Sequence, residues 1–123
     1  MILTLIPDLM MRSKVDVAAN HYGLPVRHAR SEDAFREALR DGGLDLILVD
    51  LDADDDIEAM ARVIDDTRRE SMGAVVGFCS HVKTELIQAA RAAGAHSVMA
   101  NSTFAASVAG LVGEVAARRA AQN

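Results

Sequence analysis

One short apolar run, residues 44–49, constrains the fold of this chain more than any other feature. A Gly-Gly pair precedes the run, and carboxylates follow it from Asp50 onward. The run is too short for a buried helix, but it has the length of a strand covered on both faces, as in a parallel sheet. In open parallel sheets, sites form beyond the carboxyl ends of the strands. Asp50 therefore stands where a functional site is expected.

Strand-like and helix-like segments alternate along the whole chain. The expected strands are residues 2–6, 24–28, 45–51, 74–79 and 97–100, and the expected helices are residues 9–22, 31–40, 57–69, 84–93 and a last, Ala-rich helix. Asn101, Ser102 and Thr103 offer N-cap side chains to that last helix, which is expected to fray near Arg118 and Arg119. Such alternation is typical of βαβ units and a parallel sheet.

The small size favours one architecture. We expect a single domain over residues 1–123, a three-layer α/β sandwich of the flavodoxin-like type with strand order 2-1-3-4-5. The second strand then lies at an edge of the sheet, and Pro25 at its start agrees with this position because proline donates no ladder hydrogen bond.

Composition and charge exclude several classes of function. Half of the residues are hydrophobic, a quarter are charged and the net charge is −5, which argues against nucleic acid as a direct partner. The single cysteine, Cys79, suits a reducing compartment. The apolar start of the chain lacks a basic segment and is too short for a signal peptide or a membrane span. We expect a cytoplasmic protein with no membrane partner.

The order and landmarks of these segments resemble the receiver domains of bacterial response regulators (CheY-like). Residues 45–51 resemble the third strand of that family, which places Asp50 at the phosphoacceptor position. Residues 92–95, Ala-Ala-Gly-Ala, resemble the turn before the fifth strand. Ser80 falls at the position of the switch serine or threonine. The resemblance implies a signalling function in a two-component pathway.

Two landmarks of that family are missing from this sequence. The acidic pair that holds Mg²⁺ after the first strand is replaced by Ile6 and Pro7, and only the next residue, Asp8, is acidic. The Lys-Pro pair that ends the fifth strand is replaced by Asn101 and Ser102. Asp8 and Asp50 remain as the two candidate oxygen ligands for Mg²⁺. Arg12 and Lys83 are the candidate replacement cations.

The remaining polar and sulfur-containing residues have simpler interpretations beside the functional ones. Asp50 itself could instead accept backbone N–H bonds, and Asp54, Asp55 and Asp56 suit the start of a helix. The histidines lack metal-ligand spacing, and Cys79 fits a core position. The sequence has no Gly-x-Ser-x-Gly elbow, no P-loop and no Gly-x-Gly-x-x-Gly, so we expect no enzyme. Met10 and Met11 suit either core packing or an adaptable contact surface.

These observations predict a regulatory module, namely a degenerate receiver that acts through protein contacts without a cofactor. No output domain follows in the sequence, so we expect the signal to leave through a protein partner or through self-association, including a homodimer. By the resemblance, the contact face would be made by the fourth helix, the fifth strand and the last helix. Leu86, Ala90, Val108 and Leu111 would lie near this face, although we expect most of them to belong to the core. Two alternatives stay open: a working receiver phosphorylated on Asp50 with Mg²⁺, and a flavodoxin-like domain that binds or converts a small ligand.

Overall fold

The computed structural model describes residues 1–122, in which strands and helices alternate strictly. The strands are β1 (Ile2–Leu5), β2 (Val26–His28), β3 (Leu46–Asp50), β4 (Ala74–Cys79) and β5 (Ser97–Ala100). The helices are α1 (Leu9–Tyr22), α2 (Glu32–Asp41), α3 (Ile57–Glu70), α4 (Thr84–Ala93) and α5 (Asn101–Gln122). All strands pair in parallel in the order β2-β1-β3-β4-β5, so the predicted fold class is confirmed.

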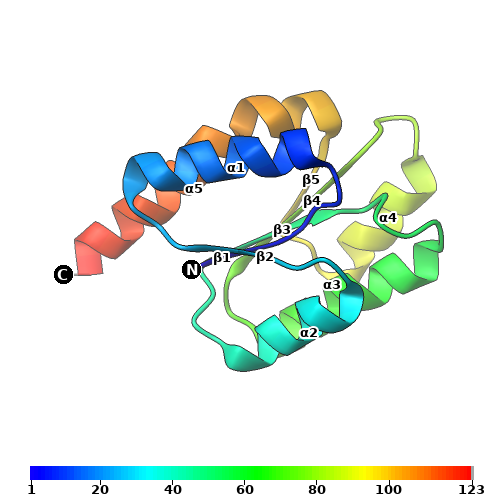
Figure 1. Ribbon diagram of the computed structural model, residues 1–123. Helices are drawn as coiled ribbons and strands as arrows, with labels where there is room; N and C mark the ends of the chain where they lie inside the picture. Colours follow the sequence, from blue (N-terminus) through cyan, green and yellow to red (C-terminus); the bar gives the residue numbers. More distant parts are fainter. Residues whose placement is uncertain (123) are drawn as a thin grey trace.

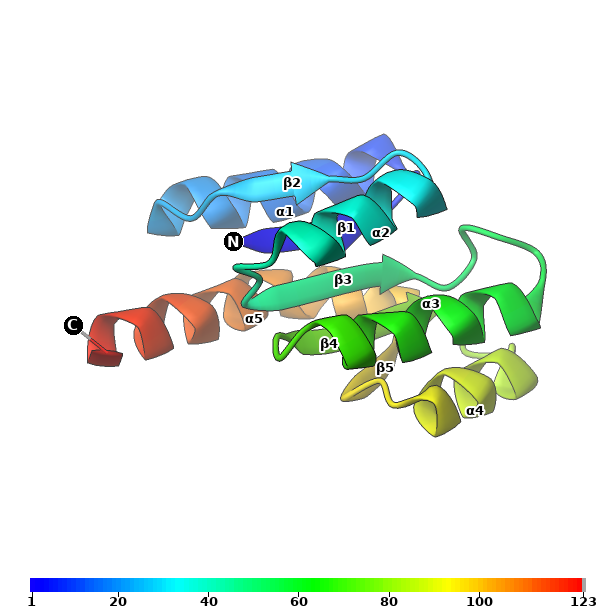
Figure 2. The same ribbon diagram turned by 90° about the horizontal axis from the view of Figure 1, so that it is seen from below.

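The sheet lies between two layers of helices. Helices α1 and α5 cover one face, and α2, α3 and α4 cover the other (Figures 1 and 2). Side chains of β3 alternate between the two faces: Leu46 and Leu48 join the core under α1 and α5, whereas Ile47 and Val49 join the core under the other helices. This double burial explains why the run reads as continuously apolar.

Helix ends follow the signals in the sequence. Ser31 caps α2, because its side chain accepts a hydrogen bond from the backbone N–H of Ala34 at 3.0 Å. Gly23 ends α1 in the left-handed conformation at φ +67°, which only glycine adopts at little cost. Both caps lie at ends of the helices expected at residues 9–22 and 31–40.

A hydrogen-bonded chain of three side chains ties the edge strand β2 to its neighbours. His28 on β2 contacts the buried Thr4 hydroxyl of β1 through Nδ1 at 2.6 Å and the carboxylate of Asp16 on α1 through Nε2 at 2.7 Å. Both ring nitrogens of His28 therefore have hydrogen-bond partners. Its ring also provides the partner that a fully buried hydroxyl requires.

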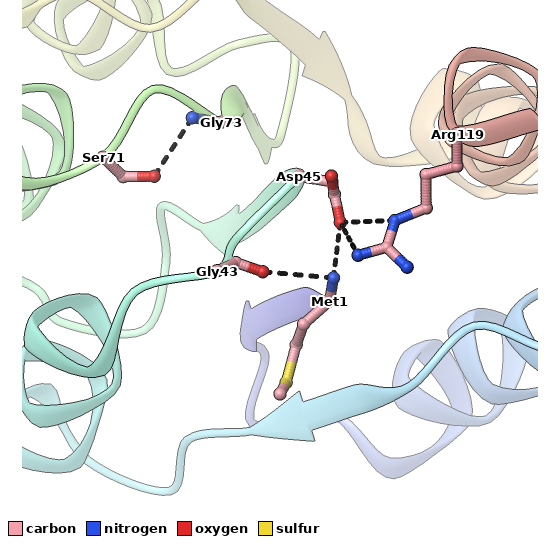
Figure 3. Close-up of polar contacts among 6 residues, drawn as sticks. All are labelled: Met1, Gly43, Asp45, Ser71, Gly73 and Arg119. Carbon is pink, nitrogen blue, oxygen red and sulfur yellow. Dashed lines mark hydrogen bonds and ion pairs between the residues drawn. The ribbon is translucent and has the colours of Figure 1, made fainter. Parts of the chain in front are cut away.

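The prediction that the last helix frays near Arg118 and Arg119 is wrong, because α5 continues to Gln122. Arg119 holds the carboxylate of Asp45, just before β3, with Nη2 and Oδ2 3.1 Å apart (Figure 3). The amino group of Met1 binds the same carboxylate oxygen. Burial alone would raise the pKa of Asp45, but these hydrogen bonds and charges lower it. The ion pair thus anchors the end of α5 to the sheet.

The start of α5 also differs from the expectation. The helix begins at Asn101, directly after the last residue of β5, so Asn101, Ser102 and Thr103 lie inside its first turn instead of capping it. Phe104 fixes this turn, since its buried ring stacks on Phe78 of β4 with the ring centres 3.9 Å apart. Within residues 1–122, no helix is both long and apolar enough to cross a bilayer.

Candidate functional site

Asp50 ends β3 at the carboxyl edge of the sheet, as predicted from the sequence. Its Oδ1 accepts a hydrogen bond from the backbone N–H of Asp52 at 2.9 Å, so the carboxylate closes the turn that follows the strand. Its main-chain oxygen accepts another from Ala53 N–H at 3.0 Å. The simpler interpretation of Asp50, an acceptor of backbone hydrogen bonds, therefore holds in this structure.

The surroundings of Asp50 disfavour its charged form. Burial raises the pKa of the Asp50 carboxyl, and the neighbouring carboxylates of Asp52 and Asp8 raise it further. The hydrogen bond from Asp52 N–H and the charge of Lys83 act in the opposite direction, but they are outweighed. Among residues 1–122, the charge of Lys83 is the one that offsets these neighbouring carboxylates in its effect on the pKa of Asp50.

Lys83 is one of the two candidate cations named from the sequence. It lies at the N-cap position of α4, in the loop after β4, and its ammonium forms an ion pair with Asp52. The hydrogen bond to Asp52 raises the pKa of Lys83. A lysine is a poor N-cap, because it has no acceptor and its charge opposes the positive end of the helix dipole. The ion pair with Asp52 offsets this unfavourable placement.

Asp8 and Arg12 are both engaged in the turn between β1 and α1. Asp8 caps α1, and its Oδ1 accepts from Met11 N–H at 3.0 Å. Arg12 donates through Nη1 to the main-chain oxygens of Ile6 and Pro7, at 3.0 and 2.8 Å. Arg12 thus binds the end of β1, which pairs with β3 through Leu5 and Val49. These contacts depend on side-chain geometry and could not be predicted from spacing.

Ser80 and Asn101 both lie at this edge of the sheet. Ser80 directly follows β4 and is half-buried, and its main-chain oxygen accepts from Lys83 N–H at 3.1 Å. Asn101 is exposed at the start of α5. Cys79, next to Ser80, is fully buried, as expected for a small core residue. No hydrogen bond joins the Ser80 or Asn101 side chain to Asp50 among residues 1–122.

The residues that would face Mg²⁺ do not fit a magnesium site. Ile6, in place of an acidic residue, is buried and offers no side-chain ligand, and its main-chain oxygen is bound by Arg12. The carboxylates of Asp8 and Asp52 are engaged as a helix cap and an ion pair. In the part of the chain that the structure describes, no three His, Cys, Asp or Glu side chains form a group that could hold a metal ion. Mg²⁺ needs several oxygen ligands in near-octahedral order.

A hollow of about 380 Å³ lies beside this site, between the loops after β3 and β4. Asp52, Asp54, Asp55 and Glu85 line it together with Lys83 and a few apolar side chains. The acidic residues suit the N-terminal ends of α3 and α4, where the helix dipole favours negative charge.

The fold, compared with solved structures, is that of response-regulator receiver domains. A response regulator from Thermotoga maritima matches 94% of this chain and 96% of its own length, with TM-score 0.71 and 20% identity. The receiver domain of NtrX from Brucella abortus matches 94% of this chain and 97% of its own, with the same TM-score and identity. At this identity the likeness concerns the fold alone.

A third solved structure adds a protein complex to these matches. It is the co-crystal structure of the Saccharomyces cerevisiae phosphotransfer protein Ypd1 with the receiver domain of Ssk1, similar over 81% of this chain and 77% of that chain at 15% identity and TM-score 0.65. No family model matches the sequence, and no curated protein sequence matches it.

Proposed function

We propose that this chain is a receiver-type signalling module that acts through protein contacts, without Mg²⁺-dependent phosphorylation of Asp50. The main support for this proposal is that the side chains around Asp50 already make other contacts. Asp8 caps a helix, Asp52 is paired with Lys83, and buried Ile6 replaces an acidic ligand. The receiver fold itself supports a place in two-component signalling.

Phosphoryl transfer to a carboxylate brings negative charge toward negative charge, so cations must neutralise it. The carboxylates of Asp8 and Asp52 already raise the pKa of Asp50, and an acyl phosphate would add to this repulsion. Lys83 is paired with Asp52, and a Lys83 that turned from Asp52 to a phosphate would leave the Asp52 carboxylate unpaired. The site favours an unmodified carboxyl that holds its loop in one conformation.

Partners of this module would be proteins. One solved neighbour is a receiver domain in complex with a phosphotransfer protein, which supports this kind of partner. We also propose that the protein has no enzymatic role and that it is located in the cytoplasm.

Intact-mass measurement after treatment with acetyl phosphate and Mg²⁺ tests the proposal. We expect the mass of the protein to stay unchanged, because no metal site assembles at Asp50. The Asp50→Asn variant is the matched control, since it keeps the Oδ1 acceptor for the Asp52 N–H. Addition of a phosphoryl group to the wild type but not to the variant would favour the alternative, a working receiver.

A further inference from the structure

The two edges of the sheet carry opposite charge. All strands are parallel, and each is followed by a helix, so the helices start at the carboxyl edge and end at the amino edge (Figure 2). The first turns of α2, α3 and α4 contain Glu32, Asp33, Glu58 and Glu85. The last turns of the helices contain Arg40, Arg68, Arg69, Arg91 and Arg119. Each placement suits its own helix dipole, but together they give the molecule an acidic end and a basic end.

A hollow of about 360 Å³ opens at the basic end. Arg118, Arg119 and His96 line it together with Met72. A backbone N–H of β4 donates to His96 Nδ1 at 2.9 Å, so the neutral ring carries its proton on Nε2 and can only donate from there. Asp45 also lines the hollow, but Arg119 already binds it (Figure 3). Arg118 forms no ion pair within residues 1–122. The hollow therefore offers hydrogen-bond donors to a partner that brings carboxylates.

The hollow at the acidic end, described above beside Asp50, has nearly the same size. Asp55 and Glu85 line it and form no ion pair within residues 1–122, and its cation, Lys83, is already paired with Asp52. This hollow lies just beyond the carboxyl ends of β3 and β4, and the basic hollow lies at the amino ends of the same two strands. The two hollows are therefore at opposite ends of one line through the molecule.

Each hollow also has an exposed apolar side chain. Met72 at the basic end is 101% exposed, and Val82 at the acidic end is 69% exposed. Single exposed apolar residues are common on protein surfaces. These two differ from that background because each is surrounded by charges opposite to those around the other. An apolar centre with a polar rim is the usual composition of a protein interface.

Charge complementarity favours a second copy of this chain as the partner. Each copy brings an acidic end that matches the basic end of another, whereas nucleic acid would meet a chain of net charge −5. At physiological ionic strength, screening acts over about 8 Å, so the net charges repel little while charges in contact still attract. A twofold contact would place like ends together, because an isologous interface pairs a surface with its own copy. The favourable contact is therefore heterologous.

We propose that copies of this chain associate head to tail, with the acidic end of one copy, around Val82, against the basic end of the next, around Met72. Each added copy leaves one end of either kind free, so association continues beyond two copies unless it closes into a ring. The charge pairs are exposed, which makes the contact weak and dependent on salt.

Head-to-tail association rests on the proposed function, since it supplies one of the protein contacts through which such a module would act. The two can fail separately. Phosphorylation of Asp50 would overturn the proposed function without changing the charges of the basic end. A chain that stays monomeric would leave the chemistry of Asp50 unchanged.

Sedimentation equilibrium of the full chain over a range of concentrations tests the proposal. The average mass is expected to rise with concentration past that of two copies. Raising NaCl from about 0.1 M to 1 M shortens the screening length from about 10 Å to about 3 Å and should weaken the association about tenfold. Arg118→Glu should weaken it to a similar extent at low salt. Lys14→Glu is the matched control, because it makes the same charge change on an exposed residue in the middle of α1 and should leave the association unchanged.

A mixing experiment makes the prediction sharper. Asp55→Arg combined with Glu85→Arg makes the acidic end basic, and this variant should not associate by itself. Mixed with Arg118→Glu, it should associate again, because its unaltered basic end meets the unaltered acidic end of the other variant. Circular dichroism checks that each variant is folded.

Several results would overturn head-to-tail association. They are a wild type that stays monomeric at every concentration, association that stops at two copies or survives Arg118→Glu, and no recovery in the mixture. A monomeric wild type that binds a short DNA duplex, and loses it in Arg118→Glu, would also overturn the proposal and assign the basic end to a polyanion.

Discussion

Replacement of Phe104 with alanine is expected to lower the free energy of unfolding by about 3–5 kcal/mol, the usual cost of deleting a buried aromatic ring. Phe104 is fully buried and stacks on Phe78, with the ring planes only 10° apart. The stack joins the first turn of α5 to the strand that pairs with β3 beside Asp50. Chemical denaturation followed by circular dichroism measures the loss.

A small domain has a total stability of about 5–15 kcal/mol, so the alanine variant could lie near the unfolding threshold. Phe104→Leu gives a graded second measurement, because leucine retains much of the buried volume. It should lose clearly less stability than the alanine variant. Equal and small losses in both variants would show that the stacked ring contributes little to the attachment of α5.

Replacement of Asp50 with asparagine is expected to raise stability at neutral pH, by roughly 0.5 kcal/mol after allowance for solvent screening. The folded state raises the pKa of this carboxyl through burial and through Asp52 and Asp8. A raised pKa means that the ionised carboxylate destabilises the folded state, fully at pH values above the folded pKa. Asparagine removes this charge and keeps the acceptor for the Asp52 N–H.

The stability advantage of Asp50→Asn should depend on pH. As the pH falls through the folded pKa of Asp50, the wild type takes up its proton and loses the penalty, so the advantage of the variant should shrink to nothing in acid. Thermal unfolding at a series of pH values measures this difference. Asp52→Asn is the control, because it removes the pair with Lys83 and should not stabilise. A less stable Asp50→Asn variant at neutral pH would contradict the account.

The fold could be predicted from local patterns because each element has its own signal. Apolar runs of strand length, caps such as Ser31 and Gly23, and the proline before β2 are readable within a few residues. The extent of α5 could not be predicted in this way, because it depends on the ion pair between Asp45 and Arg119, which are 74 residues apart in the sequence. The abrupt start of α5 likewise depends on the stack of Phe104 on Phe78.

The candidate site was predictable in position but not in detail. The end of a buried central strand located Asp50, and the sequence alone revealed that Ile6 and Pro7 cannot supply carboxylates. The pairing of Lys83 with Asp52 and the binding of Arg12 to main-chain oxygens depend on side-chain directions that no spacing encodes. The opposite charge of the two edges of the sheet was also missed, since it becomes visible only once the topology places the helix starts together on one side.

The most direct measurement for the central claim is thermal unfolding of the wild type with and without Mg²⁺ and beryllofluoride, which together imitate a phosphoryl group on an aspartate. A ligand that binds only the folded state raises the midpoint of unfolding by mass action. We predict no change in that midpoint, because the carboxylates beside Asp50 are already engaged. A rise that requires both additions and disappears in Asp50→Asn would contradict the account.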